Sequence, residues 1–261
     1  MRIVSWNMGM NTVGRFKPGT HDRAWHYLLG LGPDIACLQE ALPPSWVRNE
    51  GTLVQGPVTK WGSAIFSPRF PLDRYRIPND SPLNALGSYL AYATALLPDG
   101  QEAFIASVHT PAKEATRAQL RPLDSDEVRR PSVSRPWVND VAFAGLSRLV
   151  SSERFIFAGD WNTDRLFDRD GGTAGVEFFE RARAIGWVEC SRDDDSDLQT
   201  WFREGDAPYQ LDHAFCDPKI GDQRLGIRVA REAAEVLGLS DHAPLVMDFD
   251  VKPISMASLE S

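Results

Sequence analysis

The stretch Phe155-Ile156-Phe157-Ala158-Gly159-Asp160-Trp161-Asn162 decides the fold that we expect for this chain. Its opening apolar run predicts a buried strand, and Gly159 marks the point where that strand gives way to a turn. Asp160 and Asn162 stand two residues apart, so in an extended chain both side chains point to one side. A carboxylate placed there can orient a water while the amide holds a phosphoryl oxygen. An Asx turn after a strand is the ordinary alternative for such a pair.

Five more polar signatures stand beside apolar, strand-like runs. They are Ser5-Trp6-Asn7, Leu38-Gln39-Glu40, Val108-His109-Thr110-Pro111, Leu211-Asp212-His213 and Ser240-Asp241-His242. Taken singly, each is more often a satisfied surface group, and the hypothesis of a shared site rests on their common placement at strand ends. Together they supply carboxylates, carboxamides and imidazoles, which suit a hard divalent cation, Mg²⁺ or Mn²⁺, beside an anionic substrate.

The histidines of the chain differ in their surroundings. Asp212 stands in an apolar run, where a carboxylate is seldom buried without a partner, and His242 is a natural partner for it. His213 alternates to the opposite face of the same strand, so we expect a structural role for it. His21 and His26 fall on an expected helix and have no comparable context.

Hydrophobic periodicity predicts alternating strands and helices. Strands are expected at residues 2–6, 34–38, 62–66, 88–97, 102–109, 154–158, 210–216 and 245–251, and helices at residues 21–31, 137–150 and 176–185. Strands outnumber helices and the two alternate irregularly, which indicates a mixed α/β sandwich. Because the signatures run through the whole chain, we expect one domain over residues 1–251 and a C-terminal tail over residues 252–261.

Residues 111–136 lack apolar periodicity and mix charges with prolines that interrupt helix. We expect a helical start followed by a mobile loop on the substrate side of the site. Its basic side chains, among them Arg117, Arg121, Arg129 and Arg130, would meet substrate phosphates. A solvated surface loop is the alternative, and for any single arginine it is the more ordinary one.

Composition sets broad limits on function. The chain has 261 residues, 43% hydrophobic and 25% charged, which is typical of a soluble globular protein. A net charge of −8 argues against tight, nonspecific binding to duplex DNA, although clustered metal ligands add negative charge that a cation offsets. No apolar run is long enough for a membrane span, and because the early Asn7 leaves no room for a leader we expect a cytoplasmic protein. The three scattered cysteines indicate neither structural zinc nor a disulfide framework, and no stable protein partner is expected.

In these motifs the chain resembles the endonuclease/exonuclease/phosphatase superfamily, which has the fold of pancreatic deoxyribonuclease. That superfamily shares an early Asn after a strand, a Gln-Glu, a His before a loop, a Gly-Asp-x-Asn, a late Asp in an apolar strand and a final Ser-Asp-His. All stand here in order between Asn7 and His242, and residues 62–68 resemble another strand of the family. The resemblance implies an α/β (α+β) four-layer sandwich of two packed mixed β-sheets flanked by helices.

The resemblance also implies which residues bind metal and phosphate. Glu40 would hold the divalent cation, helped by Asn7 and Asp241. Asn162 and His109 would bind the scissile phosphate. These roles make the chain a Mg²⁺- or Mn²⁺-dependent phosphoester hydrolase.

The acid–base roles are implied in the same way. Asp160 would orient or deprotonate the attacking water. His242, paired with Asp212, would act as acid or base or stabilise the transition state. Two positions depart from particular branches of the family. Gly9 stands where abasic-site endonucleases carry an acid, and the glutamate partner of the His109-type residue is missing near residues 60–62.

Three functions remain open. Nucleic acid is the favoured substrate, because Trp61, Trp201 and Tyr209 could stack on bases and Arg117 and Arg121 could meet phosphates. Core packing is the more ordinary role for each aromatic taken singly. A phosphatase or phosphodiesterase acting on a small or inositol-type phosphoester is the alternative, compatible with the acidic charge. A non-catalytic binding module is disfavoured because the polar set is intact.

Overall fold

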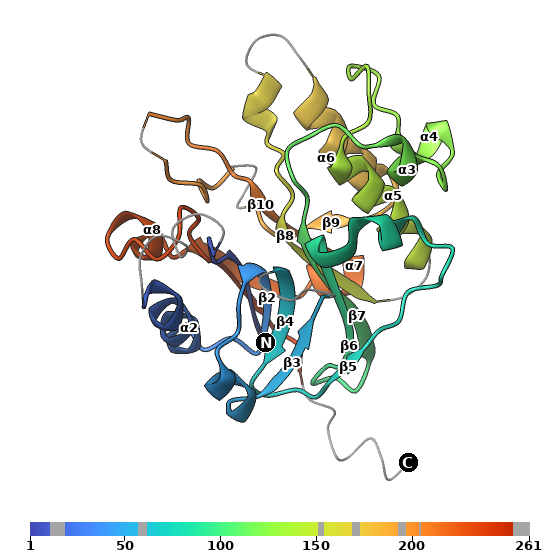
Figure 1. The fold of residues 1–261 in the computed structure, drawn as a ribbon. Coiled ribbons are helices and arrows are strands. Elements are labelled where there is room, and N and C mark those ends of the chain that lie inside the picture. The colour runs from blue at the N-terminus through green and yellow to red at the C-terminus, as the bar shows by residue number, and fades with distance from the viewer. Residues whose placement is uncertain are drawn as a thin grey trace, which may run out of the picture.

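The computed structural model describes residues 1–10, 19–56, 62–150, 154–168, 173–192, 197–203 and 205–252. Within them, two six-stranded mixed sheets pack face to face, which confirms the expected sandwich (Figure 1). The first sheet, in the order β11-β12-β1-β2-β4-β3, consists of β1 (Arg2–Asn7), β2 (Ile35–Ala41), β3 (Thr52–Gln55), β4 (Gly62–Ser67), β11 (Arg224–Val229) and β12 (Leu245–Phe249). The second, in the order β5-β6-β7-β8-β10-β9, consists of β5 (Leu72–Arg74), β6 (Leu90–Leu96), β7 (Glu102–His109), β8 (Phe155–Asp160), β9 (Val188–Glu189) and β10 (Asp212–Cys216).

Helices cover the outer faces of both sheets, and Figure 1 shows them on opposite sides of the sandwich. The first sheet is covered mainly by α2 (Thr20–Gly30), with α8 (Glu232–Glu235) beside it. The second is covered by the 3₁₀ helix η2 (Pro82–Tyr89), α5 (Val138–Leu149) and α6 (Ala174–Ala184). The shorter helices are η1 (Ser45–Asn49), α3 (Arg117–Leu120), α4 (Ser125–Val128), η3 (Arg165–Asp168) and α7 (Pro218–Gly221).

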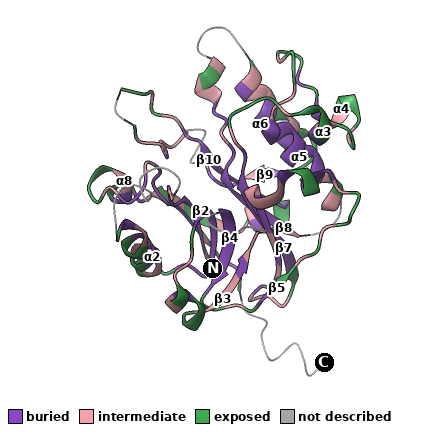
Figure 2. Cartoon of the chain, in the orientation of Figure 1, coloured by how far each residue is buried: buried purple, intermediate pink, exposed green. Residues whose placement is uncertain are grey.

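Side-chain alternation along the central strands builds the layers. On β8, Ile156 and Ala158 face the core between the sheets, while Phe155 and Phe157 face the helices. On β1, Ile3 faces the inter-sheet core, while Val4 and Trp6 face α2. Both sides of each central strand are therefore buried (Figure 2), which explains why these strands are almost continuously apolar in the sequence.

Residues 111–136 contain the expected helical start, α3, and also a second short helix, α4. Thr116 begins α3 with a capping box, and Asp124 does the same for α4. Arg130 is only 5% exposed, and its Nε lies 3.0 Å from Oδ1 of the buried Asp140 on α5. The prediction that Arg130 meets substrate is therefore wrong, because its charge is neutralised inside the protein.

In the described parts of the chain, no helix combines the length and apolar character needed to cross a membrane.

Candidate active site

Three predicted site residues stand in one row at the ends of neighbouring strands. β7 and β8 are parallel and pair His109 with Asp160, while β8 and β10 are antiparallel and pair Asp160 with Asp212. Residues paired across strands share a face of the sheet, and Asp160 lies on the same face as Ala158, which points to the other sheet. The row therefore faces the gap between the two sheets, and all three side chains are buried.

The first sheet supplies the opposite wall. Asn7 ends β1 and pairs in register with Gln39 of β2, so Glu40 follows one position later. The Asn7 Nδ2 donates to Oδ2 of Asp160 at 2.9 Å and joins the two sheets, while its Oδ1 accepts from the Gly9 amide at 3.0 Å. Asn7 is 4% exposed and Glu40 is 7% exposed, so the wall lies largely inside the protein.

His242 completes the cluster from the loop before β12. Its Nδ1 lies 2.8 Å from Oδ2 of Asp212, and its Nε2 lies 3.9 Å from Oδ2 of Asp160. The backbone around it is fixed, because its carbonyl accepts from Trp6 Nε1 at 2.9 Å and its amide donates to Ser240 Oγ at 3.1 Å. The carboxylate of Asp212 accepts the Nδ1 proton, which leaves Nε2 facing the centre of the cluster.

Burial and charge separate the proton affinities of these groups. Burial opposes the cationic form of His242, but Asp212 and Asp160 together raise its pKa to about 10. Burial raises the pKa of Asp160 to about 7, although the charge of His242 acts against this. Burial, reinforced by the charge of His242, lowers the pKa of His109 to about 4. At neutral pH, His242 is therefore cationic and His109 is neutral.

Tyr89 is a neighbour of His109 that the sequence did not indicate. Its ring meets the imidazole edge-on, with centroids 5.6 Å apart. The Nδ1 of His109 is buried and makes no hydrogen bond within the described part of the chain. An aromatic ring from η2 thus touches the histidine for which the sequence showed no glutamate partner.

Two site residues adopt a backbone conformation that is unusual for side chains of their kind. Among the described non-glycine residues, positive φ occurs at Glu40 (45°) and Asn162 (46°). Asn162 also donates its backbone amide to Oδ1 of Asp160 at 3.0 Å, as an Asx turn requires. Such backbone strain clusters at functional sites, and here both instances fall on residues that the motifs singled out.

The oxygen donors at the ends of β1 and β2 fit a hard divalent cation. Glu40 offers a carboxylate, and the Asn7 carbonyl oxygen retains a lone pair beyond its bond to Gly9. Asp241 is half-buried beside Ser240, in the loop that leads to β12. Across the described residues, no group of three His, Cys, Asp or Glu side chains could hold a metal ion. The donor set matches magnesium, which binds through one or two carboxylates together with water and substrate oxygens.

The predicted stacking residues lie together beside His242. Trp201 forms an isolated β-bridge with His242, and its ring lies 6.0 Å from that of Tyr209. Both aromatic side chains are half-buried, so each keeps a solvent-facing part. Trp61 lies outside the described residues. Stacking on a base stays a prediction for this pair.

The predicted phosphate contacts of residues 111–136 lie further along the surface. Arg117 and Arg121 are exposed at the two ends of α3. That helix packs against η2, which carries Tyr89 and hence lies next to His109. Their role in substrate binding stays a prediction.

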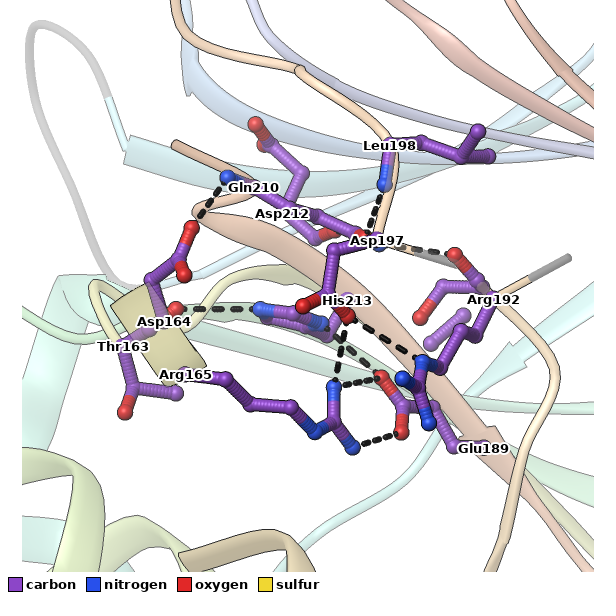
Figure 3. A network of polar contacts seen from close by, with 12 residues as sticks. Thr163, Asp164, Arg165, Glu189, Arg192, Asp197, Leu198, Gln210, Asp212 and His213 are labelled. Carbon is purple, nitrogen blue, oxygen red and sulfur yellow. Dashed lines mark hydrogen bonds and ion pairs between the residues drawn. The ribbon is translucent and has the colours of Figure 1, made fainter. Parts of the chain in front are cut away.

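A polar network around His213 lies on the face of β10 opposite to Asp212 (Figure 3). His213 faces away from Asp212, is 1% exposed, and contacts Glu189 and the carbonyl of Thr163. Asp164 accepts from the amide of Gln210, two residues before β10. The predicted placement of His213 on the face opposite to Asp212 is confirmed. Asp164 and Gln210 were missed, although an acidic residue two positions after Asn162 was a usable turn signal.

Comparisons with known proteins identify the family and agree with the fold. A model of the Endonuclease/Exonuclease/phosphatase family matches residues 4–242. Among solved structures, a variant of the 3′ phosphatase NExo from Neisseria, bound to product DNA hairpin, is 18% identical, with a TM-score of 0.68 over 96% of this chain and 99% of that one. An AP endonuclease from Archaeoglobus fulgidus is 15% identical, with a TM-score of 0.61 over 96% and 100%. The endonuclease domain of TRAS1, a telomere-specific non-LTR retrotransposon, is 15% identical, with a TM-score of 0.63 over 96% and 98%. Comparison with curated protein sequences gives no match.

Proposed function

Because the chain belongs to the endonuclease/exonuclease/phosphatase family, we propose that it is a divalent-metal-dependent phosphodiesterase that hydrolyses nucleic acid. The observation that carries the proposal is the meeting of His242, Asp212 and Asp160 between the two sheets. A cationic histidine held by one carboxylate and facing another is an acid–base arrangement at a strand-end site.

Metal binding is assigned to the first sheet. Glu40 and Asn7 would hold Mg²⁺ or Mn²⁺, with Asp241 as a further candidate. When bound, the cation supplies charge stabilisation to the phosphoryl oxygens. Family members generally use divalent metals, and the oxygen donors described above support the same expectation here.

Proton handling is assigned to the second sheet and His242. Asp160 would orient or deprotonate the attacking water, and a pKa of about 7 suits a base that works near neutral pH. The Nδ1 of His242 donates its proton in a hydrogen bond to Asp212. Its Nε2 would face the reacting phosphate, where the positive charge of the imidazolium would stabilise the transition state. His109, neutral at pH 7, and Asn162 would bind the phosphoryl oxygens by hydrogen bonds.

Nucleic acid is the favoured substrate class. The similar Neisseria protein was solved with a DNA hairpin, and other similar structures are named as endonucleases. In this chain, the half-buried Trp201–Tyr209 pair beside His242 and the exposed Arg117 and Arg121 would meet bases and phosphates. The net charge of −8 favours the second candidate, a phosphatase or phosphodiesterase acting on a small or inositol-type phosphoester.

One assay panel separates these candidates. The purified chain, supplied with Mg²⁺ or Mn²⁺, is incubated with single- and double-stranded DNA, RNA, inositol phosphates and a chromogenic phosphodiester. We expect hydrolysis of nucleic acid that stops with EDTA and returns with added metal. Undiminished turnover after thorough EDTA treatment would contradict the metal assignment. Hydrolysis of inositol phosphates with none of nucleic acid would establish the second candidate.

A further inference from the structure

The side chain of His213 lies between two groups that can only accept hydrogen bonds. Its Nε2 lies 3.0 Å from the carbonyl oxygen of Thr163, and its Nδ1 lies 3.2 Å from Oε1 of Glu189 (Figure 3). A carbonyl oxygen cannot donate, and neither can an ionised carboxylate. Both ring nitrogens must therefore carry protons, which makes His213 a buried imidazolium.

The carboxylates around His213 support this state, although the positive charge of Arg165 opposes it. Glu189 on β9 faces it and also pairs with Arg165 of η3 at 2.6 Å, so the carboxylate bridges two cations and stays ionised. Asp197 pairs with the same arginine at 2.9 Å. Asp164 is the other acid whose charge acts on this histidine. Two aromatic rings also lie near it: the ring of Phe179 on α6 lies 4.7 Å from the imidazole, and Phe215 lies further along β10.

The hydrogen bond from His213 Nε2 reaches the residue that directly follows Asn162. Thr163 follows Asn162, whose positive φ places its backbone in a conformation that must be held by its surroundings. The next residue, Asp164, accepts from the Leu166 amide at 2.6 Å and from the amide of Gln210. Thus the half-buried Asn162 begins a turn whose far side is anchored to β10.

We propose that His213 is a positioning residue that, as a doubly protonated imidazolium bonded to Thr163 and Glu189, holds Asn162 in its phosphate-binding conformation. His213 touches no reacting group, because it lies on the face of β10 opposite to Asp212. It acts through the carbonyl of Thr163. The inference rests on the proposed function in one respect, namely that Asn162 binds the phosphate.

Two amide substitutions of His213 test whether its hydrogen bond to Thr163 positions Asn162. In His213→Gln the side-chain amide can reach the Nε2 position and donate to Thr163, whereas in His213→Asn it reaches only the Nδ1 position near Glu189. Both remove the charge, so they are matched for its loss. We expect His213→Asn to lower kcat about 10-fold or more with KM within about 2-fold, and His213→Gln to retain most of kcat. Equal kcat in the two variants would overturn the proposal.

Nuclear magnetic resonance gives a readout that needs neither turnover nor stable variants. With ring-¹⁵N-labelled histidine, both nitrogens of His213 should show the chemical shifts of a protonated imidazole at pH 7, and an unprotonated nitrogen would overturn the proposal. The signal is assigned by its loss in His213→Gln, or by its through-space contacts with Phe179 if that variant does not fold.

The backbone amide of Asn162 reports on positioning independently of catalysis. Its resonance should move in His213→Asn and stay near the wild-type position in His213→Gln, and the reverse order would overturn the proposal. These measurements are made on the metal-free protein. If no phosphoester is hydrolysed at all, the proposed function fails, while the NMR results still decide the state of His213 and its hold on Asn162.

Discussion

At Asp160, burial opposes the negative charge while Asn7 and the amide of Asn162 stabilise it by hydrogen bonds. The result is a carboxylate whose pKa lies near 7, next to a histidine whose pKa lies near 10. Both groups thus hold their protons more tightly than free side chains, whose pKa values are 3.8 and 6.5. Neighbouring groups with perturbed pKa values are typical of acid–base sites, and here packing causes both shifts.

The variants Asp160→Asn and His242→Ala should each lower kcat by about 10²–10⁴-fold, the usual contribution of a general acid or base. Turnover is measured on the substrate that the assay panel identifies. Circular dichroism checks that the variants fold. Asp160→Asn is isosteric, whereas His242→Ala should lower stability because it leaves the buried Asp212 without its partner. Near-normal rates in both variants would show that Asp160 and His242 do not take part in catalysis.

The variant Glu40→Gln should mainly weaken the binding of the divalent cation. The neutral amide keeps one oxygen donor but loses the charge that attracts the cation. Its kcat should therefore be low at limiting Mn²⁺ and should recover toward wild type as Mn²⁺ is raised. Asp160→Asn is the matched control, since we expect its defect to persist at every metal concentration. A Glu40→Gln defect that is insensitive to metal would contradict the assignment.

Glu189 should contribute to stability in a pH-dependent way. Burial would raise its pKa, but His213 and Arg165 prevail and lower it from 4.5 to about 2. A lowered pKa in the folded state stabilises the protein above pH 4.5, and this contribution is lost as pH falls toward 2. Glu189→Gln should therefore reduce the free energy of unfolding by about 3 kcal/mol at pH 7, with a smaller reduction at about pH 3.5.

Urea unfolding at both pH values measures this difference. The exposed Glu180 of α6 offers a control, and Glu180→Gln should leave stability within about 0.5 kcal/mol of wild type at either pH. An equal loss for Glu189→Gln at the two pH values would show that its ion pairs do not carry the effect.

At the scale of elements, the segment between β7 and α5 contains arginines of two kinds. Arg117 and Arg121 stand exposed on α3, whereas Arg130 is buried against Asp140. Both kinds look alike in the sequence, because spacing within a charged stretch does not reveal which charge meets a buried partner. The two kinds should respond differently to substitution.

Replacing Arg117 and Arg121 with Ser should raise KM for a polymeric substrate more than for a small chromogenic phosphodiester. A polymer carries flanking phosphates for these arginines to meet, and a small ester does not. Stability should change by less than about 0.5 kcal/mol for each exposed position. Equal effects on both substrates would remove the support that α3 gives to a nucleic-acid substrate.

Arg130→Ala should instead destabilise the fold by about 3 kcal/mol, because it removes one partner of a buried ion pair. The remaining Arg181–Asp140 contact at 2.7 Å limits the loss. Urea unfolding measures the change. A fully stable Arg130→Ala variant with a raised KM would restore the original prediction that this arginine meets substrate.

At the scale of the whole molecule, two sheets bring together groups that are remote in sequence. Asn7 comes from the first strand and His242 from the loop before β12, yet their side chains lie 2.9 Å and 3.9 Å from Oδ2 of Asp160 at the end of β8. A divalent cation held at Glu40 would add an attraction between the two sheets at this site. Metal binding and folding should therefore be coupled.

Mg²⁺ or Mn²⁺ should stabilise the folded chain. At a metal concentration about 100 times Kd, the free energy of unfolding should rise by about 2.7 kcal/mol, as expected for a ligand that binds only the folded state. Thermal or urea unfolding with and without metal measures the shift. Glu180→Gln should respond as wild type, whereas Glu40→Gln should respond less. An identical shift in both variants would place the metal elsewhere.

The motifs of the sequence determined the family, and the resemblance to that family implied the two-sheet fold. The strand ends that carry polar groups followed from local features, namely side-chain alternation with period two and polar residues that directly follow apolar runs. The same alternation predicted that the side chains of Asp212 and His213 lie on opposite faces of their strand. The roles of the site residues stay predictions, although the structure brings the central ones together.

The tertiary structure alone decided which groups meet. The contact of Tyr89 with His109, the burial of Arg130 against Asp140 and the acceptors on both sides of His213 each join segments that are distant in the chain or separated by loops. Proton affinity and ion pairing depend on burial and on partners a few ångströms away. Those quantities arise only when the sheets and helices pack, so no local pattern in the sequence contains them.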